Sequence, residues 1–151
     1  MRNLRFPAVL LPSLMLVLAS CAAATPTPAM GTSIDVTLQE WSVLPAQASA
    51  PAGEVTFSVT NNGPDDVHEF VVMKTDLDPG ALPTVEDGSV DEAGEGIDVV
   101  VGEIEDIAVG ATMDLTVTLA AGNYVLLCNI YTAEEDEAHY EMGMRTAFTV
   151  Q

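Results

Sequence analysis

The feature that most constrains the fold is a series of short segments in which apolar and polar residues alternate. The clearest is 54–60, and the same period of two runs through 33–38 and 113–119. Successive side chains of a β-strand point to opposite faces, so each segment is expected to form a half-buried strand. Three further segments are strand-like: 68–73, 124–128 and 147–150. Turns rich in Gly, Pro and Asn separate the segments, and none has the sustained apolar spacing of an amphipathic helix. We therefore predict an all-β fold of two sheets, a sandwich or a barrel.

A long connection is predicted between two of these strands. Residues 76–98 are rich in Gly, Pro and acidic residues. This composition is typical of a solvated loop, so we expect the segment to run over the surface.

The first 20 residues have the pattern of a secretory signal. Arg2 and Arg5 precede an apolar run at 6–19, and this run is too short and too interrupted by proline to span a membrane stably. Leu18-Ala19-Ser20-Cys21 resembles the lipobox of bacterial lipoproteins, which implies cleavage after residue 20 and lipidation of Cys21. The alternative is an ordinary signal peptide that is cut nearby.

This pattern predicts three parts of the chain. Residues 1–20 would be the signal peptide, and residues 21–31 the lipidated cysteine with a flexible tether of Pro, Ala and Thr. Residues 32–151 would form the folded domain. We expect this domain to be exported and held on the extracytoplasmic side of a membrane through its lipid anchor alone.

The charge balance excludes several partners. The formal net charge is −19, from 4 basic and 23 acidic side chains. Beyond the predicted signal only Lys74 and Arg145 are basic, whereas a nucleic acid or an anionic lipid surface is bound by clusters of Lys and Arg. The acidic excess is expected mainly to solvate the surface. A hydrophobic fraction of 48% argues against disorder, and the length favours a single domain.

Four residues supply potential metal ligands. The predicted domain contains one thiol, Cys128, so no structural disulfide is expected within it. It contains two histidines, His68 and His139, and Met144 follows His139 by five residues. Two imidazoles, a thiolate and a weak thioether are the donor set of a mononuclear type 1 copper site. Met142 is an alternative thioether donor, although the Gly-Met step favours Met144.

The residues around these donors are similar to those of the cupredoxins. The segment 53–64, followed by His68-Glu-Phe-Val-Val, resembles the first ligand region of that family. Gly122-Asn-Tyr-Val-Leu-Leu-Cys128, then His139, Gly143-Met144 and 147–150, resembles its C-terminal ligand loop. The resemblance implies a Greek-key β-sandwich with one type 1 copper ion near one end. It implies as ligands His68, Cys128, His139 and Met144, and as function one-electron transfer rather than catalysis.

Three features depart from the family pattern. The gap of ten residues between Cys128 and His139 is longer than in the small cupredoxins, and it carries four acidic residues at 134–137. Glu69 stands where several members have an Asn that ties the ligand loops together, and Val67 stands where azurins have a Gly. These changes bear on the axial geometry and the reduction potential rather than on the ligand set.

Other functions could use the same residues. A copper chaperone or store would favour exposed Met-rich or His-rich clusters, which the sequence lacks. A zinc site could combine His68, Cys128 and His139 with an acid from 134–137. A Cys–His nucleophile would leave His68 unused and lacks an evident orienting group.

The expected partner is a redox protein with a basic docking surface that residues 134–137 would attract, and the protein is expected to be a monomer. Trp41 is most simply a core or rim aromatic.

Overall fold

The computed structural model describes residues 31–151. The predicted signal peptide at 1–20, the predicted lipidation site Cys21 and nearly all of the predicted tether lie outside the described residues.

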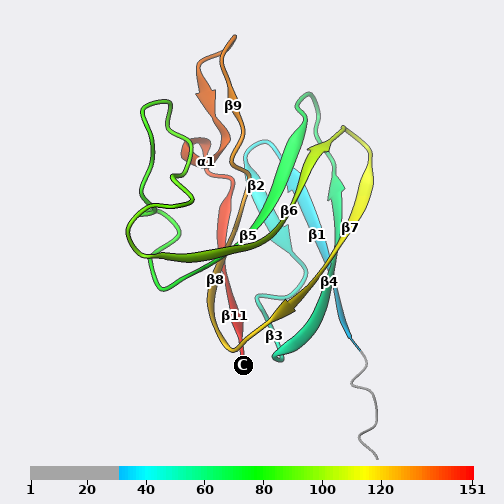
Figure 1. Cartoon of the computed structure of the whole chain (residues 1–151). Helices are drawn as coiled ribbons and strands as arrows, with labels where there is room; N and C mark the ends of the chain where they lie inside the picture. The colour runs from blue at the N-terminus through cyan, green and yellow to red at the C-terminus, as the bar shows by residue number, and fades with distance from the viewer. Residues whose placement is uncertain (1–30) are drawn as a thin grey trace, which may run out of the picture.

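Two β-sheets lie face to face (Figure 1). The first has the strand order β2-β1-β4-β7, and its strands are β1 (Thr32–Gln39), β2 (Ser42–Pro45), β4 (Gly53–Asn61) and β7 (Thr112–Leu119). The second has the order β3-β11-β8-β5-β6, and its strands are β3 (Ser49–Ala50), β5 (His68–Thr75), β6 (Ile97–Ile107), β8 (Gly122–Leu127) and β11 (Arg145–Val150). β1 pairs with β4 in parallel, and β11 pairs with β3 in parallel, whereas the other pairs within these sheets are antiparallel.

The alternating segments form strands whose apolar face lies between the sheets, as predicted. On β4 the side chains of Val55, Phe57 and Val59 are fully buried. Phe57 packs between two aromatic rings of the other sheet, with centroid distances of 5.4 Å to Phe70 and 5.6 Å to Phe148. The polar residues of the same strand face outward and form side-chain hydrogen bonds with β7. The alternation therefore places one core between the two sheets.

The connection between β5 and β6 differs from the prediction. Residues 76–96, which we call the strap, do not only run over the surface, because Leu82 and Val90 are buried. They form a second apolar cluster with the outward side chains of β5 and β8, including Val71 and Leu127. β5 is consequently buried on both faces, and Val71, whose side chain points away from the main core, is inaccessible to solvent.

The segment between β8 and β11 lies at one end of the sandwich. It contains a short hairpin of β9 (Tyr131–Thr132) and β10 (Glu137–Ala138), followed by the single-turn helix α1 (His139–Met142). In Figure 1 this segment, coloured orange, lies beside the green strap. Among residues 31–151, no helix has both the length and the hydrophobicity that crossing a membrane requires.

Candidate metal centre

The structure brings three of the four predicted ligands together at the end of the core. His68 begins β5, Cys128 directly follows β8, and His139 begins α1. The Nδ1 atoms of the two histidines are 3.2 Å apart, and the Cys128 Sγ lies 3.4 Å from the His139 Nδ1. All three side chains are buried. Residues that are far apart in the sequence thus direct three donor atoms at one point.

Backbone hydrogen bonds fix the segment that carries two of these donors. The N–H of Cys128 donates to the carbonyl of Met144, and the N–H of Met144 donates to the carbonyl of His139, each at 3.0 Å. The N–H of His139 donates to the carbonyl of Ile130 at 2.9 Å. These bonds hold the two ends of residues 128–144, which we call the ligand loop, close together, although ten residues separate Cys128 from His139.

The spacing of the donor atoms fits a shared metal ion. Metal–nitrogen distances near 2.0 Å and metal–sulfur distances near 2.3 Å, with tetrahedral angles of about 109°, place ligand atoms roughly 3.3–3.5 Å apart. The observed separations of 3.2 Å and 3.4 Å agree with these values. A set of two imidazoles and one thiol suits copper or zinc rather than the hard cations Mg²⁺ and Ca²⁺, which prefer oxygen.

Met144 is buried in the same apolar cluster as Cys128. Its backbone is bonded to both Cys128 and His139, so its position in the chain is tied to the other donors. Met142 is 43% exposed. The role of Met144 as a fourth ligand stays a prediction, and burial favours it over Met142.

The protein environment keeps the three donors uncharged in the absence of a metal. Burial raises the pKa of the Cys128 thiol to about 12, although backbone N–H groups of Glu69 and Ile130 act in the opposite direction. Burial also lowers the pKa of the His68 and His139 imidazoles. The imidazoles therefore present free lone pairs at neutral pH, and a bound ion would displace the thiol proton.

One residue that the sequence did not single out is Glu40, in the turn between β1 and β2. Its Oε1 atom lies 3.6 Å from the His68 Nε2 and accepts hydrogen bonds from the N–H groups of Asp65 and Asp66. Burial alone would raise the pKa of the Glu40 carboxyl, but these N–H donors, led by Asp66, and the nearby His68 bring it below its ordinary value. At 3.6 Å this is a close approach rather than a hydrogen bond, and the buried His68 Nε2 has no hydrogen-bond partner among the described residues. A carboxylate that accepts a hydrogen bond from the outer nitrogen of a metal-binding histidine orients the ring, and Glu40 is the residue placed to do so.

Trp41, next to Glu40, was expected from the sequence to be a core or rim aromatic, and the structure places it against the imidazoles. Its ring lies edge-on to His139 at a centroid distance of 4.9 Å and to His68 at 6.4 Å. A Cβ added at Gly143, whose φ is +122°, would lie only 3.2 Å from the Trp41 carbonyl oxygen. The ligand loop and Trp41 therefore pack closely, and Trp41 covers both imidazoles as a rim aromatic. No local pattern signals these contacts, because Glu40 and Trp41 are remote in sequence from the histidines.

Glu69, the residue after His68, contacts the Cys128 thiol through its backbone. The Glu69 N–H donates to the Cys128 Sγ at 3.2 Å, so the backbone of β5 contacts the thiol directly. Burial and the neighbouring carboxylates, led by Glu103, raise the pKa of the Glu69 side chain to about 7. Residues 134–136 are exposed at the tip of the β9–β10 hairpin, and no described contact places them at the donors.

Comparison with known proteins identifies the fold. No family model and no curated protein matches the sequence. The chain is similar to reduced auracyanin from the photosynthetic bacterium Roseiflexus castenholzii, with a TM-score of 0.58 and 23% identity, over 80% of this chain and 97% of that one. It is similar to rusticyanin from Thiobacillus ferrooxidans, with a TM-score of 0.53 and 18% identity, over 80% and 77% of the two chains. An azurin from Methylomonas sp. strain J gives a TM-score of 0.50 and 15% identity, over 82% and 98%. All three are cupredoxins, and the protein has the cupredoxin fold, the all-β sandwich expected from its sequence.

Proposed function

We propose that the protein binds one copper ion and carries single electrons between redox proteins. The observation that supports this most is the convergence of the His68 Nδ1, the His139 Nδ1 and the Cys128 Sγ in a buried position. Bound copper would alternate between Cu(II) and Cu(I), taking one electron from a reduced partner and giving it to an oxidised one. The cupredoxin fold is consistent with this role.

The protein's own contribution would be to hold one donor geometry for both oxidation states. His68 and Cys128 are attached to paired strands, and backbone bonds fix His139 relative to Ile130 and Met144. Met144 would supply a weak thioether donor. A fixed arrangement of this kind limits the rearrangement that accompanies electron transfer, and it favours a carrier over a protein that releases copper.

Copper loading tests the proposal. The purified protein loaded with Cu(II) is expected to show intense visible absorption from thiolate-to-copper charge transfer and an EPR spectrum of one copper per chain, whereas Zn(II) gives no colour. Cys128→Ser should abolish the colour, and His139→Ala should bleach or strongly alter it. A fully coloured Cys128→Ser protein would overturn the assignment.

A second measurement separates a carrier from a copper-handling protein. Reversible one-electron voltammetry with slow loss of Cu(I) to a strong chelator is expected for a carrier. Rapid surrender of Cu(I) together with sluggish electron exchange would favour the copper-handling alternative instead.

We also propose that the domain is exported and anchored through lipid on Cys21, and that it acts as a monomer. Cys21→Ser should prevent partition into a detergent phase, and unchanged partition would contradict the lipid anchor.

The acidic residues at 134–137 would attract a redox partner with a basic surface. The electron-transfer rate with such a partner should therefore fall as ionic strength rises, and a rate independent of salt would exclude this attraction.

A further inference from the structure

The strap contacts the ligand loop immediately beside two of the candidate ligands. Asn129 follows Cys128 in the sequence, and Tyr140 follows His139. Both Asn129 and Tyr140 direct their polar groups at the backbone of the strap. The two ligand positions are thus linked to one segment that supplies no metal donor itself.

Asn129 pairs with Val90 of the strap almost as a neighbouring strand would. The Val90 N–H donates to the Asn129 Oδ1 at 2.6 Å, and the Asn129 Nδ2 donates to the Val90 carbonyl at 3.2 Å. The same Nδ2 also lies 3.1 Å from a carboxylate oxygen of Glu92. Because one side chain satisfies both backbone groups of Val90, the chain direction just after Cys128 is fixed relative to the strap.

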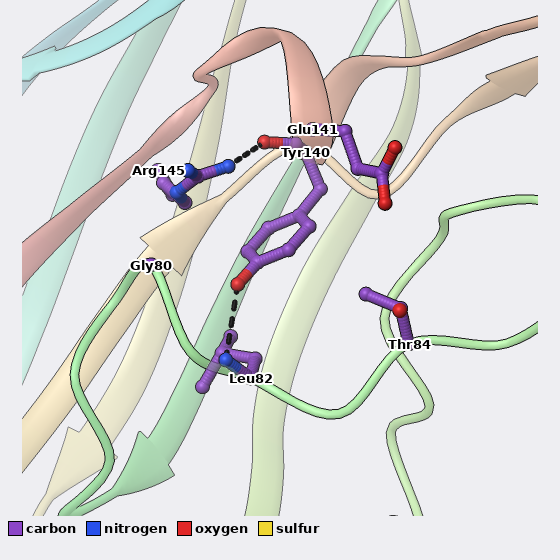
Figure 2. Close-up of a pocket in the computed structure, with 6 residues that line it drawn as sticks. All are labelled: Gly80, Leu82, Thr84, Tyr140, Glu141 and Arg145. Atoms are coloured by element: carbon purple, nitrogen blue, oxygen red, sulfur yellow. Dashed lines mark hydrogen bonds between the residues drawn. The ribbon is translucent and has the colours of Figure 1, made fainter.

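Tyr140 forms the second link, and Figure 2 shows its hydroxyl bonded to Leu82 in a pocket that both residues line. Its hydroxyl accepts a hydrogen bond from the Leu82 N–H at 3.0 Å and donates one to the Pro79 carbonyl at 2.9 Å. Tyr140 is only 3% exposed. The guanidinium of Arg145 lies over the Tyr140 ring, 4.6 Å from its centroid, and donates to the Tyr140 carbonyl. The residue after His139 is therefore held from both sides.

The strap has internal hydrogen bonds of its own and packs closely against the ligand loop. Thr84 and Val90 form a β-bridge, and the Asp91 N–H donates to the Pro83 carbonyl at 2.9 Å. At its tip, a Cβ added to Gly88 would lie 3.0 Å from the Cβ of Ala138 and 2.9 Å from a side-chain carbon of Glu141. A hairpin-like segment packed this closely can restrict the conformations that the ligand loop adopts.

We propose that the strap holds the ligand loop in its metal-binding shape, with Asn129 and Tyr140 as positioning residues for Cys128 and His139. This proposal rests on the metal site of the proposed function. It explains how a gap of ten residues between Cys128 and His139 is compatible with a fixed donor geometry. The simpler role, in which the strap only covers the outer face of β5 and β8, predicts a different pattern of mutational effects.

The first test uses the metal-free protein. Opening of the ligand loop exposes the buried Cys128, so the alkylation rate of its thiol, followed on the Cys128 peptide by mass spectrometry, reports the loop directly. Tyr140→Phe and Asn129→Ala are expected to raise this rate by about tenfold or more, because each removes buried or partly buried hydrogen bonds to the strap.

Two control variants make the same chemical changes elsewhere in the fold. Tyr124→Phe removes the hydroxyl of another buried tyrosine, which donates to the Ala120 carbonyl at 2.8 Å. Asn123→Ala removes an amide that reaches the start of the strap through Asp76 at 2.9 Å, away from the donors. Neither control should raise the alkylation rate. Rates within twofold of wild type for both strap variants, or an equal increase in the controls, would overturn the proposal.

The second test uses the copper-loaded protein. Tyr140→Phe and Asn129→Ala should change the copper hyperfine splitting in EPR and speed the loss of Cu(I) to a chelator by about tenfold, whereas the controls should alter neither. Unchanged spectra and release rates in the strap variants would also count against positioning. If wild type develops no charge-transfer colour, the proposed function fails, but the alkylation rates still decide whether the strap holds the loop.

Discussion

Asn61, at the end of β4, offers a sharp test of how the site end of the sandwich is held. Its side chain is fully buried and makes three hydrogen bonds to backbone groups, all at 2.8 Å. The Nδ2 donates to the carbonyls of Asp66 and Ile107, and the Oδ1 accepts from the Gly63 N–H. One amide therefore joins β4, the end of β6 and the turn that leads into His68.

The expected cost of losing this side chain follows from these bonds. Each hydrogen bond contributes about 1 kcal/mol net, so Asn61→Ala should lower the free energy of unfolding by about 3 kcal/mol. Asn61→Asp keeps the acceptor for Gly63 but replaces the two-fold donor by an oxygen that faces two carbonyl oxygens. It should destabilise the protein at least as much as Asn61→Ala, although it preserves the shape of the side chain.

Urea unfolding of the metal-free protein measures both effects. Asn62→Ala is the matched control, because the neighbouring Asn62 is exposed, and its effect should stay within about 0.5 kcal/mol. The reasoning is refuted if Asn61→Ala costs less than about 1 kcal/mol or if Asn61→Asp is as stable as wild type. Weaker metal binding by Asn61→Ala would follow from the displaced turn before His68.

Four further predictions concern the site and the core. Met144→Leu should keep the colour of the copper-loaded protein but raise its reduction potential in voltammetry, whereas Met142→Leu should leave the potential unchanged; equal shifts would remove Met144 from the axial role. Glu40→Ala should weaken Co(II) and Cu(II) binding by about 10- to 100-fold in competition titrations, and unchanged affinities would exclude a role for Glu40. Because the pKa of Glu69 is raised to about 7, the folded apoprotein binds more protons there than the unfolded chain, and wild type loses stability as pH rises from about 4.5 through 7. Glu69→Gln should therefore stabilise the apoprotein relative to wild type at pH 8 more than at pH 5 in urea unfolding, and no difference between the two pH values would contradict the shift. Phe57→Ala should lower the free energy of unfolding by about 3–5 kcal/mol, since its ring is fully buried between two aromatics; a loss below 1 kcal/mol would show that the ring does not anchor the core.

The sequence predicted the parts of the fold in which a local pattern reflects burial. β4 has one face in the core and one in solvent, so its alternation of Val55, Phe57 and Val59 with Thr and Ser indicates both the strand and its orientation. β6 was not predicted as a strand. Most of its residues are exposed or half-buried, it contains Gly102 and several acids, and its pairing with β5 is interrupted by register shifts.

The remaining differences arise from contacts between distant segments. Leu82 and Val90 are isolated apolar residues in an acidic loop, and their burial depends on a sheet face that the strap itself covers. The identities of His68, Cys128 and His139 could be proposed from the scarcity of these residue types. The contact of Glu40 with His68 and the hydrogen bond of Tyr140 with Leu82 beside His139 could not be predicted in this way. Both depend on which turns and loops meet at the end of the sandwich.

The wide separation of the donors in the sequence has a thermodynamic consequence. His68 lies on β5, whereas Cys128 follows β8, and these strands pair only in the folded protein. The unfolded chain consequently has no preformed site with all three donors, so an ion held by them binds the folded state preferentially and shifts the unfolding equilibrium. At a free-ion concentration one hundred times the dissociation constant, this linkage adds about 2.7 kcal/mol to the free energy of unfolding. The melting temperature of this protein should therefore rise with the logarithm of the free-ion concentration once that concentration exceeds the dissociation constant.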